Sequence, residues 1–227
     1  MNAAADQSAE RLALYRRVAR CLNRFFARWT APRCGRCLEL MRVHHRGDPR
    51  ADVVLVDGLF PGCCQAGVAD RWAVPGAGPR GVFPPGLCRA LERERRRAGP
   101  SPGPAEYTVR ERRTGREARG VGCAHLGPAG CVLGELKAPL CLTFLCDPLR
   151  AELAARAGWA LVGADGDDFC GSREVLAAVA TAGLAAAAVA VAGLEGRLRR
   201  LEGRLAEAAG PGQAGSGKGS SPSCSTR

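Results

Sequence analysis

The first apolar pattern along the chain recurs at helical spacing between about Ser8 and Trp29. Its apolar positions alternate with arginines and are Leu12, Leu14, Tyr15, Val18, Cys21, Leu22, Phe25, Phe26 and Trp29. Such spacing places apolar side chains on one face of a helix and charged side chains on the other. The pattern predicts an amphipathic helix within residues 1–31, and Pro32 lies where it would discourage continuation. We expect this helix to pack over a small core, with membrane association as the less favoured alternative.

A second helical pattern occupies residues 172–209. Its first half, Val175 to Leu194, is almost wholly apolar and about 20 residues long, which is enough to cross a bilayer. Most of these residues are alanine and no aromatic residue marks either end, so we favour a buried helix against the N-terminal helix. The second half spaces four leucines as in a coiled coil. The sequence thus predicts one long Ala/Leu-rich helix, followed by a disordered Gly/Ser-rich tail at 210–227.

The chain between these helices, residues 32–171, contains only short apolar segments. The apolar run from Asp52 to Asp57 predicts a short buried strand. Tyr107–Arg112 and Arg116–Val121 flank a Thr-Gly turn and predict a hairpin. Trp159–Val162 predicts one further short strand.

Proline and glycine interrupt this middle region. Residues 74–104 are rich in both and predict an insertion or surface loop with one short helix near Cys88 to Arg97. Asp147-Pro148 predicts the start of a helix that ends at Gly158. Together these patterns predict an α+β fold with a small, irregular, cysteine-rich core. We expect metal to hold this core, and its short strands to pack against the long N- and C-terminal helices.

Composition directs attention to the cysteines. Twelve cysteines in 227 residues indicate either disulfides in a secreted chain or metal in an intracellular one. Residues 1–30 contain arginines throughout and show no secretory signal, so we expect a cytoplasmic protein that uses its thiols for metal. The net charge of +11 favours anionic partners only weakly, because arginines are spread over several segments.

Four of the cysteines, Cys123, Cys131, Cys141 and Cys146, lie within 24 residues. The glycines and prolines between them favour turns, which suits a chain that folds around an ion. Thiolates bind soft or borderline metals at about 2.3 Å. The cluster therefore predicts metal or iron–sulfur ligation, the alternative being four buried cysteines that act as small apolar residues.

Two further cysteine pairs lie upstream. Cys34 and Cys37 are separated by two residues, the shortest common spacing for ligands of one ion, although such a pair can also be a redox dithiol. Cys63 and Cys64 are adjacent and follow a glycine-bounded turn. The candidate metal ligands are therefore Cys34, Cys37, Cys63, Cys64, Cys123, Cys131, Cys141 and Cys146.

The downstream cysteines form part of a longer motif, which comprises Cys123, Leu126, Gly130, Cys131, Lys137, Cys141 and Cys146. This motif resembles the YkgJ-type cysteine-cluster family, which is described as a zinc- or iron-chelating domain. That family has a compact upstream CxxCxxCC-like element, whereas here the two upstream pairs are 25 residues apart. Leu142 stands where the family commonly has arginine. The resemblance covers roughly residues 34–146 and implies zinc or iron bound by thiolates.

The ligand set stays open at several points. Eight thiols could form one four-ligand site, with the other four not bound to metal, or they could form two sites. Adjacent cysteines rarely bind one ion, so one of Cys63 and Cys64 could serve a second metal or none. Three histidines are less favoured substitutes, namely His44, His45 and His125. Four other cysteines are assigned to helix packing or to the tail, namely Cys21, Cys88, Cys170 and Cys224.

The sequence best fits a metal-binding protein that holds Zn²⁺ or an iron–sulfur cluster, between which spacing does not decide. The alternatives are an iron–sulfur redox enzyme or electron carrier, and a zinc-stabilised nucleic-acid-binding module. No His-Glu-x-x-His, Gly-x-Ser-x-Gly or phosphate-binding motif accompanies the thiols. No specific nucleic acid is expected, because glutamates are interspersed with the arginines and aromatic residues are scarce.

Overall fold

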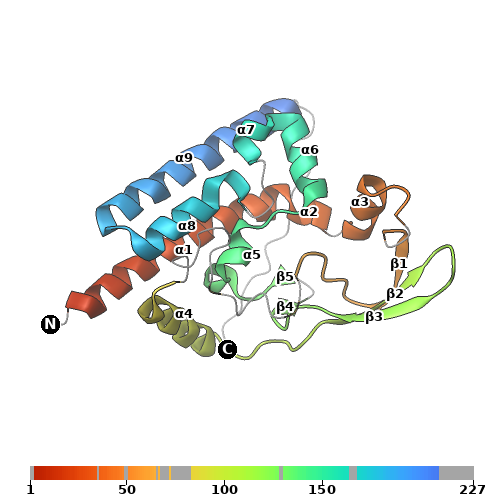
Figure 1. The fold of residues 1–227 in the computed structure, drawn as a ribbon, viewed down its shortest axis with the longest axis horizontal. Coiled ribbons are helices and arrows are strands. Elements are labelled where there is room, and N and C mark those ends of the chain that lie inside the picture. Colours follow the sequence, from red (N-terminus) through yellow and green to blue (C-terminus); the bar gives the residue numbers. More distant parts are fainter. Residues whose placement is uncertain are drawn as a thin grey trace, which may run out of the picture.

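The computed structural model describes residues 3–34, 36–48, 51–64, 66, 72, 83–127, 130–163 and 168–209. A layer of packed helices forms one end of the molecule, and a small antiparallel sheet projects at the other (Figure 1). Long helices lie near both ends of the described chain. This arrangement confirms the α+β fold class. The predicted tail at 210–227, with Cys224, lies outside the described residues.

Helix α1 (Ala3–Trp29) is the central element of the helical layer. Its apolar face is buried, with Tyr15, Val18 and Leu22 fully inaccessible to solvent. Several of its arginines contact the segments that pack on it: Arg17 makes two hydrogen bonds to Glu195, at 2.6 and 2.7 Å, and Arg20 pairs with Glu135 at 2.8 Å. The predicted amphipathic helix is confirmed and begins five residues earlier than its apolar pattern.

The predicted single helix over 172–209 is wrong, because the structure has two helices there. Helix α8 (Ser172–Thr181) ends at Ala182, whose backbone is extended, and α9 (Leu184–Ala209) begins after Gly183. Arg11 of α1 donates hydrogen bonds to the carbonyl oxygens of Val179 and Ala182, at 2.6 and 2.8 Å. A helix leaves its last carbonyls without partners, and a cation there is favourable, so α1 stabilises the break.

Both α8 and α9 pack against α1, as expected for a buried apolar segment. The four predicted stripe leucines, Leu194, Leu198, Leu201 and Leu205, are all buried. In the described part of the chain, no helix has both the length and the apolar character needed to cross a bilayer.

Helix α4 (Pro85–Arg97) is the short helix predicted near Cys88 to Arg97 within the surface loop, and it begins three residues earlier. It packs against α1 and buries Leu87 and Leu91 almost completely. Phe83, just before it, meets Tyr15 edge-on at a ring separation of 5.4 Å. The predicted short helix is thus confirmed, whereas its expected place at the surface is wrong, because two leucines at helical spacing anchor it against α1 despite its many arginines. Residues 74–82 of that loop lie outside the described residues.

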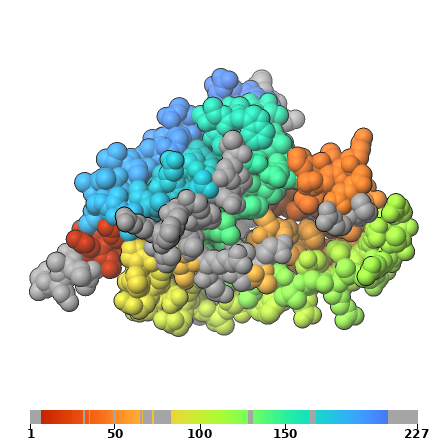
Figure 2. Space-filling model, viewed as in Figure 1, coloured from red at the N-terminus to blue at the C-terminus, as the bar shows by residue number. Residues whose placement is uncertain are grey.

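Three strands form the main sheet in the order β1 (Val53–Gly58), β2 (Glu106–Glu111) and β3 (Glu117–Val121), all antiparallel. The predicted strand and hairpin are confirmed. The expected burial of β1 is wrong, because Leu55 and Val56 are 41% and 42% exposed. The sheet extends beyond the helical layer instead of lying beneath it (Figures 1 and 2).

Short elements connect the sheet to the helical layer, and most of them contain a candidate ligand or lie next to one in the sequence. They are α2 (Ala31–Cys34), α3 (Cys37–His44), β4 (Leu126–Gly127), β5 (Gly130–Cys131), α5 (Pro139–Thr143) and α6 (Asp147–Ala157). Helix α6 confirms the predicted helix that ends at Gly158, whose φ is +88°. The strand predicted next is wrong: Trp159–Val162 is a helical turn, α7, because Gly158 and Gly163, with φ of +88° and +96°, change the chain direction on either side of these four residues.

Candidate metal centre

The eight candidate cysteines come from separate elements that meet between the helical layer and the sheet (Figure 1). Cys34 ends α2, Cys37 begins α3, and Cys63-Cys64 follow β1. Cys123 follows β3, and three more lie downstream: Cys131 on β5, Cys141 on α5 and Cys146 before α6. Every cysteine in the described residues is a free thiol. The fold thus brings thiols far apart in sequence into one region.

An ion pair between α2 and α6 brings Cys34 toward Cys146. The Arg33 guanidinium pairs with Glu152 on α6, and the Cys34 amide donates to the Thr30 carbonyl at 2.9 Å. Burial raises the pKa of Cys34, and the nearby Cys146 thiol raises it further through like-charge repulsion. Burial is also the main cause of the raised pKa of Cys146 itself. These two thiols are electrostatic neighbours despite 111 intervening residues.

Cys37 lies beside the turn that precedes Cys63. Gly62 has a φ of +57°, and a methyl group at its position would lie 3.2 Å from the Cys37 Sγ. Burial, followed by Cys146, Cys34 and Cys64, raises the pKa of Cys37 to about 11. A glycine here allows both the left-handed turn and its close approach to the thiol. Sequence reasoning missed this role, although a glycine directly before two cysteines was a visible signal.

Cys63 is electrostatically coupled to the same upstream thiols. Its side chain reaches the surface, yet the protein around it restricts hydration enough to raise its pKa to about 12. After burial, the causes are the adjacent Cys64 and then Cys146, Cys34 and Cys37.

Cys64 instead packs with the downstream thiols. Its carbonyl accepts a hydrogen bond from the Cys123 amide at 3.0 Å. Cys64 and Cys131 pack, with Leu126, against buried Cys123 and Leu133 in a small cluster separate from the main core. Burial, followed by Cys131 and Cys123, raises the pKa of Cys64 to about 11, while Lys137 opposes the rise.

Cys141 lies on α5 near this small cluster. Burial, followed by Cys131, Cys64 and Cys123, raises its pKa to about 12, and Lys137 again lowers it. The Lys137 ammonium donates to the Asn23 side chain at 2.7 Å, which ties this segment to α1. The segment therefore holds a cation beside several thiols.

The thiols lie near one another but do not form a coordination shell. Within the described ranges, no three side chains of histidine, cysteine, aspartate or glutamate converge closely enough to hold a metal ion. The donor set nevertheless suits zinc or an iron–sulfur cluster, because both accept purely thiolate ligation. Cysteine has one rotatable side-chain bond, so thiols on facing elements can converge by rotation.

Of the remaining candidates, His125 lies beside the thiols, because its amide donates a hydrogen bond to the Cys123 Sγ at 3.5 Å, and the others lie elsewhere. Cys21 and Cys170 are buried in the main core and Cys88 packs at its edge, as expected for packing residues. His44 and His45 meet edge to face, with ring centroids 4.7 Å apart, at the far end of α3. The His125 ring bonds to the Ser101 hydroxyl at 2.6 Å.

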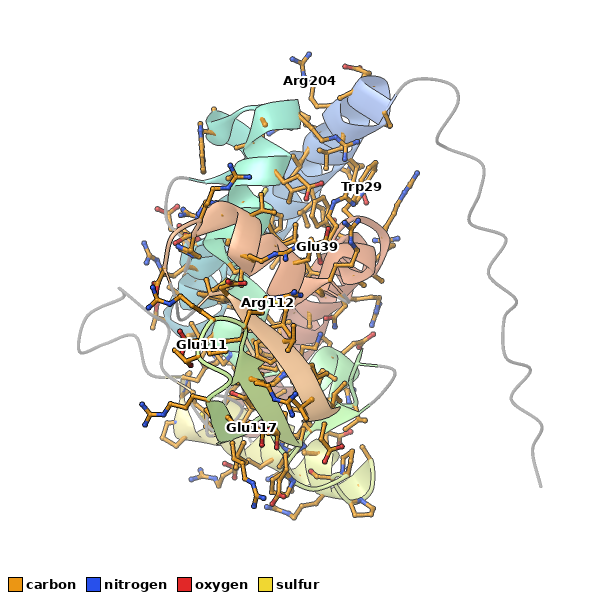
Figure 3. All side chains as sticks on the ribbon, turned by 90° about the vertical axis from the view of Figure 1, so that its right-hand side faces the viewer. Trp29, Glu39, Glu111, Arg112, Glu117 and Arg204 are labelled. Carbon is orange, nitrogen blue, oxygen red and sulfur yellow. The ribbon has the colours of Figure 1, made fainter. Side chains whose placement is uncertain are left out.

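A cavity of about 550 Å³ lies away from the thiols, between α3 and the hairpin. Its charged lining mixes both signs: Arg42, Arg46, Arg112 and Arg113 with Asp48, Asp52 and Glu111. Figure 3 shows Glu111 and Glu117 on the same hairpin as Arg112. Arg110 pairs with Glu117 at 2.6 Å, so this sheet does not present a uniformly basic surface of the kind that binds phosphates.

Comparison with known proteins gives no assignment: no protein-family model, curated protein or solved structure matches this chain. The resemblance to the YkgJ-type family stays a prediction.

Proposed function

We propose that this chain is a metal-binding protein that holds Zn²⁺ or an iron–sulfur cluster through cysteine thiolates. The ligands are the eight candidates, Cys34, Cys37, Cys63, Cys64, Cys123, Cys131, Cys141 and Cys146. The observation that supports this most is the gathering of these thiols from separate elements at one junction, with mutual repulsion contributing to several of their raised pKa values. A bound cation would replace that repulsion with attraction.

The alternative, that these cysteines merely fill an apolar core, fits the geometry poorly. Cys34 and Cys63 reach the solvent, whereas cysteines used for packing are normally buried. Cys21 and Cys170 show the packing role in this same chain, since both are buried in the main core. Two exposed thiols beside several half-buried ones are better explained by ligation.

The location suggests a structural contribution. The sheet has exposed apolar residues and extends beyond the helical layer, so little apolar burial holds it in place. The thiols lie on the segments that join the sheet to the helices. A metal there would fix the sheet against the helical layer, and its binding free energy would add to folding free energy.

Elemental analysis of anaerobically purified protein, with an absorption spectrum, tests this proposal. We expect stoichiometric zinc in a colourless protein, or iron and sulfide in a brown one. The variant Cys88→Ser is the matched control, because Cys88 is a half-buried thiol outside the proposed ligands, and it should keep the full metal content. Protein that contains no metal, and takes up none when reconstituted with zinc or with iron and sulfide under reducing conditions, would exclude the function.

A further inference from the structure

We propose that the eight cysteines form two separate four-thiolate sites, and that the adjacent Cys63 and Cys64 belong to different ones. The first site comprises Cys34, Cys37, Cys63 and Cys146, and the second comprises Cys64, Cys123, Cys131 and Cys141. This inference rests on the proposed metal-binding function and specifies its stoichiometry. It also explains why two cysteines stand next to each other.

Packing defines the second site. Cys64, Cys123 and Cys131 share one small apolar cluster with Leu126 and Leu133. The backbone reinforces this grouping, because the Cys123 amide donates to the Cys64 carbonyl at 3.0 Å and Leu126 pairs with Cys131 across β4 and β5. Cys146, in contrast, packs against the main helical core. The downstream cysteines therefore divide between two environments.

Helix contacts define the first site. Arg33 pairs with Glu152, which holds the end of α2 against α6 and so brings Cys34 toward the start of α6 at Cys146. Helix α3, which begins at Cys37, also contacts α6. The turn at Gly62 approaches the Cys37 Sγ, so the next residue, Cys63, adjoins the same group.

The number of ligands assigns the remaining thiol. Four thiolates complete a tetrahedral site, and Cys34, Cys37, Cys63 and Cys146 already complete the first. Cys141, on α5 and ten residues after Cys131, therefore completes the second.

Metal stoichiometry tests the division. Metal-free, reduced chain is titrated with Co²⁺ alone while thiolate-to-cobalt charge-transfer absorption is followed. We expect saturation at two ions per chain. Saturation at one ion would overturn the two-site inference and leave the metal-binding function standing, whereas no cobalt–thiolate absorption would count against both. This titration uses the unaltered chain and does not depend on how any variant folds.

Paired variants then assign the ligands. Cys34→Ser/Cys37→Ser should lose one of two ions, and so should Cys123→Ser/Cys131→Ser, while the combination of all four loses both. Cys63→Ser should weaken only the ion that the first pair removes, and Cys64→Ser only the other. Loss of both ions in either paired variant, with its helical circular dichroism intact, would contradict separate sites. Cys88→Ser should still bind two.

Discussion

The Tyr15 hydroxyl on α1 donates a hydrogen bond to the main-chain carbonyl of Lys137, four residues before Cys141. Tyr15 is fully buried, so this bond joins the helical core directly to the cysteine-rich segment. The same segment is held a second time by the hydrogen bond from Lys137 to Asn23. The position of the candidate ligands therefore depends on α1 as well as on the loops that contain them.

Replacing Tyr15 with phenylalanine should lower stability at neutral pH and should make stability less sensitive to high pH. At pH 7, Tyr15→Phe removes one hydrogen bond and should cost about 1 kcal/mol. Burial raises the pKa of Tyr15 well above 10, so its stabilising effect is complete below pH 10 and is lost as pH rises toward the folded-state pKa. The variant should therefore lose less stability than the parent chain between pH 10 and 12. Urea unfolding across this range measures the difference, and parallel pH profiles would contradict it.

Gly62 and Gly134 offer a matched pair of substitutions. Both have a left-handed backbone, with φ of +57° and +51°, so alanine at either should cost about 1–2 kcal/mol in stability. Only at Gly62 would the new methyl group contact the Cys37 Sγ, whereas at Gly134 nothing lies within 4 Å. We expect Gly62→Ala to weaken metal binding at the first site and Gly134→Ala to leave it unchanged. Equal cobalt affinities in the two variants would argue against the position assigned to Cys37.

Metal removal should destabilise the segments that contain the thiols, residues 51–64 and 123–146, more than the helical layer. The main core joins α1, α4, α6, α8 and α9 through apolar side chains, so it should persist without metal. A chelator under reducing conditions should therefore increase hydrogen exchange in residues 51–64 and 123–146 while α1 and α9 stay protected. Unchanged exchange in both segments would indicate that metal does not hold the sheet.

Truncation of a buried side chain in the helical core should lower stability without changing the metal content. Leu201→Ala removes a fully buried side chain of α9 and should cost about 2–5 kcal/mol. Val189→Ala, at a position 73% exposed on the same helix, should change the free energy of unfolding by less than about 0.5 kcal/mol. Both variants should retain the metal content of the parent chain. Metal loss from folded Leu201→Ala protein would show that the helical layer positions the thiols more tightly than proposed.

Sequence patterns predicted elements whose causes are local. The apolar stripe of α1 and the hairpin around Thr114-Gly115 were confirmed because spacing and turn residues determine them. The break at Ala182 was missed, because the apolar pattern continues on both sides and the groups that stabilise it belong to Arg11. The burial of α4 was missed for a similar reason: its two buried leucines are outnumbered by arginines.

The same distinction between local and distant causes applies to the candidate site. Cysteine spacing identified the eight thiols, because ligand pairs and turn formers are local signals. The division between Cys63 and Cys64 could not be predicted, since it depends on which distant segments lie beside each of them. Cysteine spacing identifies the candidate ligands, whereas the packing of distant segments decides which of them belong to the same site.

The contact of α1 with α8 and α9 also imposes an order on folding. The end of α1 at Trp29 precedes the start of α8 at Ser172 by 143 residues, so during synthesis α1 leaves the ribosome long before these two helices. Until they emerge, the part of α1 that packs against α8 and α9 stays uncovered, and residues 34–146, which contain the thiols, are translated before the helical layer is complete. Closing so long a loop is slow, and partly folded chains expose apolar surface. A nascent chain of this protein therefore presents reactive thiols and an uncovered apolar helix together, the state in which chaperone binding would protect it most.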